Sequence, residues 1–222
     1  MAKSKVVTVQ QAVEKISDGQ TILIPGFVNT GVPETLIKGI CAKGCKALKI
    51  ISNNTSVKGR GIGILVHENR LKHVTCSHIG SNTETVEKVL AGELDVTFVP
   101  QGTLAERVRA GGAGIGGVLT PTGLGTPIAE GKQVIAVDGV DYLLETALRG
   151  DVAIIRAWKA DKMGNVVYHR TARNFNQVFA TAADWVIVEA EEIVETGELD
   201  PDLIMTPGAL VDAVVQAEPR EV

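Results

Sequence analysis

Hydrophobic residues in the first half of the chain recur alternately at helical and at strand spacing. Val9 and Val13 share one helical face, and Thr8 with Gln11 forms a capping-box signal where this helix would begin. The apolar run 21–24 that follows is short and predicts a buried strand. The pattern therefore predicts a helix and then a strand as the first two elements.

The same alternation predicts the remaining elements. Pro33 suits the first turn of the next helix, and Gly44 suits its end. Residues 53–63 are polar and interrupted by glycine, which predicts a loop. Further strands are predicted at 48–52, 73–77, 96–99, 134–137, 142–145, 152–158, 166–168 and 185–189, and further helices at 82–91, at 104–110 and around 175–183.

Strands that are apolar throughout and separated by helices indicate a parallel sheet covered on both faces. We expect an α/β fold with a mostly parallel sheet, formed by residues 1–222 as a single domain. Ligands of such sheets bind just beyond the carboxyl ends of the strands. The segments of interest are therefore 25–31, 52–54, 77–82 and 100–103.

Composition and charge exclude several classes of protein. The 222 residues carry a net charge of −4 without a Lys/Arg cluster, whereas a nucleic-acid surface needs a basic stripe. A run of about 18 apolar residues, which a membrane span requires, is missing from the sequence. The first residues lack the apolar stretch of a secretory signal, so we expect a cytoplasmic protein. Cys41, Cys45 and Cys76 follow no pattern and predict free, partly buried thiols.

The sequence does not support a site for a common cofactor or metal. Residues 112–117 match the G-x-G-x-x-G spacing of dinucleotide sites, but they follow a helical stretch and do not open a helix after a strand. Residues 111–117 are open to two interpretations, a flexible turn or a loop whose backbone approaches a ligand. The four histidines lack metal-ligand spacing, and we expect no bound metal.

The segments at the predicted strand ends offer hydrogen-bond donors. Residues 25–31 lead directly into the helix at Pro33, and backbone N–H groups before a helix N-terminus suit an anion such as a pyrophosphate. Asn53, Asn54 and Gln101 add side-chain amides, which acyl transfer requires where a carbonyl oxygen becomes negative. Each amide alone could simply form a turn or cap a loop. Three at one sheet edge favour a site.

An evident nucleophile is missing from the sequence. It contains no G-x-S-x-G elbow, and no cysteine has a suitable histidine and acid in context. An acidic run near the end of the chain predicts a solvated strand end. The alternative is that one of its residues is a catalytic carboxylate, but no partner residue in the sequence supports this. The run comprises Glu189, Glu191, Glu192 and Glu195.

Two long segments carry distinctive motifs. Residues 18–33 read DGQTILIPGFVNTGVP, and residues 100–107 read PQGTLAER and continue to Gly123. With shorter blocks at 142–145, 157–160, 164–165 and 172–176, they resemble the class I CoA-transferases, specifically the alpha (A) subunit of the two-subunit bacterial enzymes. Residues 50–53, 77–82 and 205–208 look most like the acetate or butyrate:acetoacetate branch. The resemblance implies a fold related to that of sugar-phosphate isomerases.

The resemblance also implies an activity. The chain would help to move CoA between a short-chain acyl-CoA or 3-oxoacyl-CoA and a free acid such as acetate, butyrate or acetoacetate. In the family, this ping-pong reaction passes through a glutamyl-CoA thioester on the beta subunit. A beta partner, an α2β2 heterotetramer and CoA as a substrate rather than a permanent cofactor are therefore implied.

By the same resemblance, one loop binds CoA, and it comprises Pro25, Gly26, Phe27, Val28, Asn29, Thr30 and Gly31. Gln101 and Asn54 become candidates for orienting the acyl group or donating to the oxyanion. Pro25 departs from the glycine usual in the family and carries no N–H, so one backbone donor is missing from the loop.

Two hypotheses from other classes remain at this point. One is a non-catalytic sensor of a small molecule such as a sugar phosphate, on a related α/β scaffold. The other is a nicotinamide-dependent oxidoreductase, which the misplaced glycine pattern already disfavours.

Overall fold

The computed structural model describes residues 3–219 and contains a large parallel sheet and a small antiparallel one. The single-domain expectation also includes residues 1–2 and 220–222, which lie outside the described residues. The large sheet has the strand order β11-β10-β8-β1-β2-β3-β4, in which all neighbours are parallel, and β9 pairs antiparallel with β8. The prediction of a mostly parallel sheet is thus confirmed. Its strands are β1 (Thr21–Leu23), β2 (Leu48–Ile51), β3 (Leu71–Cys76), β4 (Asp95–Phe98), β8 (Gly150–Asp161), β9 (Val166–Val167), β10 (Ala183–Val194) and β11 (Ala213–Gln216).

Helices cover both faces of the large sheet because successive strand residues point to opposite sides. Ile22 and Ile154 pack in one buried cluster with α1 (Val9–Val13), α2 (Glu34–Lys43) and α3 (Ile62–His67). Leu23 and Ile155 pack in the other, with α5 (Gln101–Gly112) and α6 (Asn176–Phe179). The remaining helix, α4 (Thr83–Leu90), begins at Asn82, whose side chain accepts a hydrogen bond from the N–H of Thr85.

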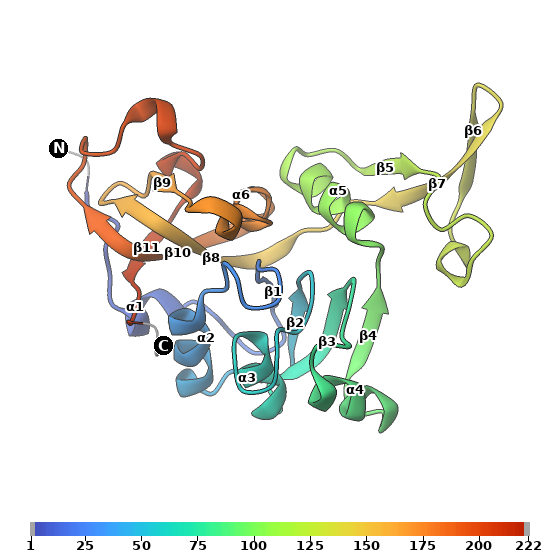
Figure 1. The fold of residues 1–222 in the computed structure, drawn as a ribbon, viewed down its shortest axis with the longest axis horizontal. Coiled ribbons are helices and arrows are strands. Elements are labelled where there is room, and N and C mark those ends of the chain that lie inside the picture. The colour runs from blue at the N-terminus through green and yellow to red at the C-terminus, as the bar shows by residue number, and fades with distance from the viewer. Residues whose placement is uncertain (1–2, 220–222) are drawn as a thin grey trace.

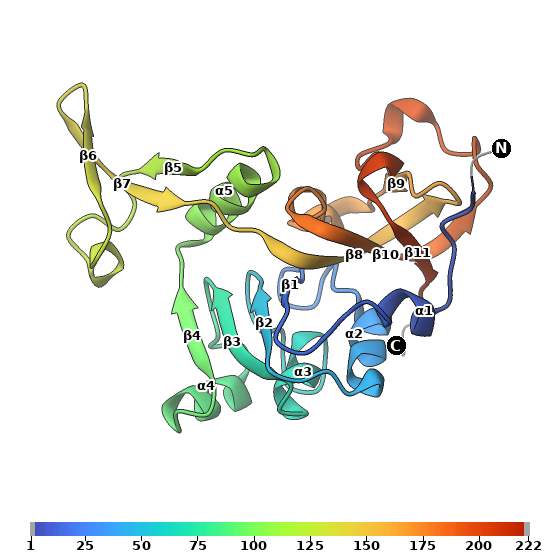
Figure 2. The same ribbon diagram turned by 180° about the vertical axis from the view of Figure 1, so that it is seen from behind.

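The small sheet projects from the rest of the molecule, as Figure 1 and the reverse view in Figure 2 show. It has the order β5-β7-β6, with β5 (Gly117–Thr120), β6 (Val134–Val137) and β7 (Val140–Thr146), and both pairings are antiparallel. The sequence predicted β6 and β7 as strands but not their separate sheet. Short 3-10 turns complete the fold at Pro127–Ala129, Arg170–Arg173, Pro201–Leu203 and Gly208–Leu210.

Several predicted boundaries were wrong. Helix α5 starts at Gln101, three residues earlier than expected, and runs on to Gly112. Gly111 and Gly112 are therefore helical and not part of a flexible turn. A Cβ on Gly111 would lie 2.0 Å from the Leu148 carbonyl oxygen, so this glycine allows the chain entering β8 to approach the helix closely. Helix α3 and strands β5 and β11 were not predicted.

Candidate functional site

The loop between β1 and α2, residues 25–31, ends in a tight turn at the carboxyl edge of the large sheet. Phe27 and Thr30 exchange two backbone hydrogen bonds, each 3.0 Å long. Val28, at the tip, has a φ of 56°, which is unusual for a β-branched residue and costs on the order of 1–3 kcal/mol. The side chain of Phe27 is 51% exposed. The loop therefore presents an apolar, strained tip to its surroundings.

Two asparagines bind this loop to the segment before α6. The Asn174 amide donates to the Thr30 carbonyl (2.9 Å), and the buried Asn176 amide donates to the Gly31 carbonyl (3.0 Å). Gly31 has a φ of 76°, and a Cβ there would lie 2.5 Å from the Ala172 carbonyl oxygen, so only glycine fits. Two of the sequence motifs, 18–33 and 172–176, thus meet in space.

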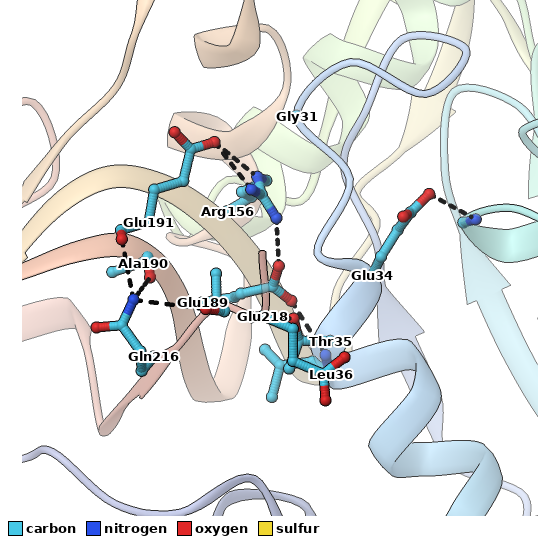
Figure 3. Close-up of polar contacts among 12 residues, drawn as sticks. Gly31, Glu34, Thr35, Leu36, Arg156, Glu189, Ala190, Glu191, Gln216 and Glu218 are labelled. Atoms are coloured by element: carbon cyan, nitrogen blue, oxygen red, sulfur yellow. Dashed lines mark hydrogen bonds and ion pairs between the residues drawn. The ribbon is translucent and has the colours of Figure 1, made fainter. Parts of the chain in front are cut away.

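The N-terminus of α2 is occupied by a side chain of the protein itself. Pro33 provides no side-chain cap, and the Leu36 N–H donates instead to Glu189 Oε2 at 3.0 Å. Figure 3 shows Glu189 reaching from β10 between Leu36 and Arg156. A carboxylate of the chain itself therefore accepts one of the N–H groups at this helix N-terminus, and the binding of an anion by the N–H groups of the 25–31 loop stays a prediction.

Arg156 neutralises this buried carboxylate. Its Nη1 contacts Glu189 Oε1, while Nε and Nη2 donate to Glu191 Oε1 at 3.1 and 2.8 Å. The backbone N–H of Arg156 donates to Asn176 Oδ1 at 2.7 Å. Burial raises the pKa of the Glu189 carboxyl, and Arg156 together with the N–H of Leu36 opposes that rise.

The prediction of a solvated acidic strand end was wrong for Glu189, which has no exposed surface. The other three residues of that run are partly exposed and form ion pairs. They are Glu191 with Arg156, Glu192 with Lys159 and Glu195 with Lys162. A positive partner for the run therefore exists, but the sequence could not identify it.

A pocket of about 600 Å³ brings the loop together with Gln101. Gln101 is exposed as the first residue of α5, not as part of a loop. The pocket is mostly apolar with a few amides and hydroxyls, as small-molecule sites usually are. Its lining residues are Phe27, Thr30, Gln101, Ala105, Thr171, Asn174, Phe175 and Val178.

Thr30 and Gly31 also line a second pocket, of about 560 Å³, with Arg156, His169 and Glu191 among its other residues. The loop tip thus contributes to two neighbouring hollows. A larger pocket, of about 670 Å³, lies between α1 and α2 and contains none of the candidate residues.

Asn54 lies apart from these pockets. It is buried, its Oδ1 accepts a hydrogen bond from the Ser56 N–H (2.7 Å), and its backbone bridges to His78. The neighbouring Asn53 accepts from the Ser77 hydroxyl at 3.0 Å. The structure thus brings Gln101 and the 25–31 loop to one pocket, whereas Asn54 does not line it.

The sequence did not identify Arg156, Asn174, Asn176 or Glu189 as contributors to this region. Asn174 and Asn176 lay within a motif block, but nothing linked that block to the loop. The available signal for the other two was a charged residue inside or directly after an apolar strand, at 152–158 and 185–189. Such a charge is almost never fully buried unless it is paired.

Within residues 3–219, no group of three or more His, Cys, Asp or Glu side chains is arranged to hold a metal ion. None of the helices in the described part of the chain is long and apolar enough to cross a membrane. The three cysteines are free, and burial raises the pKa of the Cys76 thiol to about 11. None of them has the lowered pKa of a reactive thiol.

Known proteins are similar to this chain over almost its full length. The Escherichia coli K12 protein named acetate CoA-transferase subunit alpha is 48% identical over 216 residues, covering 97% of this chain and 98% of the relative. The Clostridium acetobutylicum acetoacetyl-CoA:acetate/butyrate CoA transferase alpha subunit is 46% identical over 213 residues, covering 96% and 98%. The chain is therefore similar along its whole length to proteins named as alpha subunits.

A solved acyl-CoA transferase from Escherichia coli O157:H7, in a thioester complex with CoA, shares the fold with a TM-score of 0.88 at 24% identity. This chain is covered to 99% and spans 50% of the solved chain. The alternative of a small-molecule sensor finds no support among these relatives. The family model described as Coenzyme A transferase matches residues 6–217. The chain belongs to the coenzyme A transferase family.

Proposed function

We propose that this chain is the alpha subunit of an enzyme that moves CoA between a short-chain acyl-CoA or 3-oxoacyl-CoA and a free acid of the acetate, butyrate or acetoacetate type. Family membership and the names of two relatives of similar length support this activity. The observation that supports a site for this activity is the pocket that Gln101 lines together with Phe27 and Thr30. CoA is a substrate in this proposal and not a resident cofactor.

In this proposal, residues 25–31 bind CoA, and Gln101 donates its side-chain amide to the acyl oxygen. Phe27, Ala105 and Phe175 give the pocket an apolar wall against which the thioester packs. Pro25 is buried and without an N–H, so the donors in the loop come from the residues after it. Asn54 shapes the strand end through its turn with Ser56.

The reaction begins when a glutamate carboxylate of the beta subunit attacks the acyl-CoA carbonyl. The C–S bond breaks, and an acyl-glutamyl anhydride and the CoA thiolate form. The thiolate then attacks the glutamyl carbonyl, which gives a glutamyl-CoA thioester and releases the first acid as a carboxylate. A second carboxylate reverses these steps and leaves as its CoA ester.

Every step passes through an oxyanion, and a carboxylate is a weak nucleophile, so preorganised donors matter strongly. In this proposal the Gln101 amide is one such donor, since the first turn of α5 brings the residue to the pocket. This chain supplies binding groups and a donor, and the partner supplies the nucleophile. We further propose an α2β2 assembly, a cytoplasmic location and a single functional unit for residues 1–222.

The first test measures turnover with acetoacetyl-CoA and acetate, with this chain alone and with a co-purified beta subunit. We expect turnover only from the complex, because the nucleophile belongs to the partner. Turnover by this chain alone would contradict the proposal that the beta subunit supplies the nucleophile. A complex that is inactive toward every short-chain acid would remove the proposed activity itself.

The second test is Gln101→Ala in the assembled enzyme. Loss of one oxyanion donor typically lowers kcat by about 100- to 1000-fold, and we expect a much smaller change in KM for the CoA ester. Gln10→Ala is the matched control, since Gln10 is exposed on α1 and lines neither strand-end pocket. An unchanged kcat in Gln101→Ala would exclude Gln101 from the reaction.

A further inference from the structure

Arg156 and Glu189 form an ion pair inside the large sheet. They are register partners on the neighbouring parallel strands β8 and β10. Their side chains are 5% and 0% exposed, and they follow Ile154 and Ile187 on the face covered by α1, α2 and α3. Two charges are thus placed where the strand pattern would otherwise continue with apolar residues.

A pair in this position contributes little to stability by itself. Removing two charges from water offsets their attraction, and apolar residues of similar volume often serve the fold equally well. Buried isoleucines precede the pair on both strands, whereas the Arg156 guanidinium reaches Glu191 and a pocket that both residues line. The presence of the pair therefore calls for a role beyond holding the sheet together.

The second oxygen of Glu189 indicates that role. While Oε1 contacts Arg156, Oε2 accepts the Leu36 N–H at 3.0 Å and is the cap that Pro33 does not provide. Glu189 thereby caps the first turn of α2, shortly after the 25–31 loop. Figure 3 shows this carboxylate between the strand and the helix, with Gly31 on the chain that leads into α2.

The other connection runs through the backbone of the same arginine. Asn176 accepts the Arg156 N–H with Oδ1 and donates to the Gly31 carbonyl with Nδ2. The loop is therefore fixed at Gly31 by Asn176 and at its helical end by Glu189. Both Asn176 and Glu189 contact Arg156 of β8, so the two restraints hold the loop in a fixed place relative to the sheet.

We propose that Glu189, neutralised by Arg156, is a positioning residue that sets the geometry of the 25–31 loop for CoA. The proposal rests on the proposed function, which assigns CoA to this loop. It makes Glu189 act through α2 and the loop without touching the substrate. It also explains why the pair is charged, because an apolar residue at position 189 leaves the Leu36 N–H without an acceptor.

The test is the double substitution Arg156→Met with Glu189→Leu in the assembled enzyme. Removing both charges together avoids an unpaired buried ion, so we expect the variant to fold, with a thermal stability lowered only by the Leu36 N–H that has lost its acceptor. KM for the CoA ester should rise about tenfold, as expected when one capping interaction is lost from the binding loop, and KM for acetate should stay within about twofold. If the ion pair served only the stability of the fold, its removal would not raise KM for the CoA ester while leaving KM for acetate unchanged.

Two further variants complete the test. Lys159→Met with Glu192→Leu removes a 2.7 Å ion pair that is in register on the same two strands but partly exposed, and we expect it to change neither constant. Arg156→Met with Glu189→Gln restores an oxygen for the Leu36 N–H without charge. It should bring KM for the CoA ester to within about threefold of the wild type.

Glu189→Asp covers the case in which the double variant does not fold. It keeps the charge opposite Arg156 but shortens the reach to the Leu36 N–H, so KM for the CoA ester should again rise and amide exchange across residues 26–36 should become faster. If a folded double variant or Glu189→Asp retains both the wild-type KM and the wild-type exchange, the proposal is wrong. A wild-type complex without CoA transfer would instead contradict the proposed function.

Discussion

The two sheets of this chain bury their strands to very different extents. In the large sheet, β8 and β10 contain long runs of buried residues and are covered on both faces. In the small sheet, Val134 and Val137 of β6 remain 49% and 41% exposed, and only Leu143 and Glu145 of β7 are buried. Figure 1 shows the small sheet standing away from the packed body.

Each sheet nevertheless contains one buried glutamate. Glu189 is paired with Arg156 and caps α2, within an extensive apolar core. Glu145 is paired with Lys132 and with Arg107 of α5, and it lies beside a single buried leucine. Burial lowers the pKa of Arg107, and attraction to Glu145 opposes that shift. The large sheet thus depends on apolar packing, whereas the small sheet depends on an ionic cluster that ties it to α5.

The largest expected effect concerns the core of the large sheet. Ile154→Ala removes a fully buried side chain, and we expect the free energy of unfolding to fall by about 2–5 kcal/mol. Val134→Ala in the small sheet is the matched control and should change it by no more than about 0.5 kcal/mol. Urea unfolding of both variants measures the difference. Similar decreases in the free energy of unfolding of the two variants would contradict the view that apolar packing stabilises the large sheet more than the small one.

The next effect concerns the ionic cluster. Glu145→Ala leaves Lys132 and Arg107 without their shared anion. We expect the free energy of local unfolding of the small sheet to fall by about 3 kcal/mol. This is the low end for a broken buried ion pair, because both cations reach solvent. Amide exchange should become faster in β5, β6 and β7 and stay unchanged in β8. Glu130→Ala, an exposed acid in the connection before β6, should affect neither. Faster exchange in both sheets would contradict the comparison.

The smallest effect is a pH dependence from buried thiols. The pKa of Cys41 on α2 is raised to about 11, and Cys76 in the large sheet behaves in the same way. Burial raises the pKa of this thiol to about 11 from an unfolded value of 9.0. Between these values the unfolded chain releases the proton and the folded chain keeps it, so the free energy of unfolding should fall as pH rises. Cys76→Ser should flatten this dependence in urea titrations between pH 8 and pH 11. An equally steep decline in that variant would assign the dependence to other groups.

The parallel sheet could be predicted because its strands are short apolar runs bounded by polar or glycine-rich segments. The capping box at Thr8 and the stop at Gly44 were also confirmed. The small sheet could not be separated from the large one, since β6 and β7 show the same strand pattern and only their partners differ. Helix α3 was missed because it is short and starts after Gly61 without a side-chain cap.

The candidate site was predictable only as far as the carboxyl ends of parallel strands lie at the same edge of a sheet. That expectation put Gln101 and the 25–31 loop at one edge, and the two line one pocket although β1 and β4 are not neighbouring strands. It could not distinguish Gln101 from Asn54, because burial in a turn depends on contacts with Ser56 and His78. It also could not place Glu189 at the start of α2, since that contact joins residues 153 positions apart.

In the function that we propose, this chain positions CoA and stabilises developing negative charge, while a carboxylate of another subunit carries the covalent intermediate. Intact mass measurement of both subunits, quenched during incubation of the complex with acetoacetyl-CoA, tests it most directly. We expect a CoA adduct on the beta subunit and an unchanged mass for this chain. An adduct on a glutamate of this chain would contradict it.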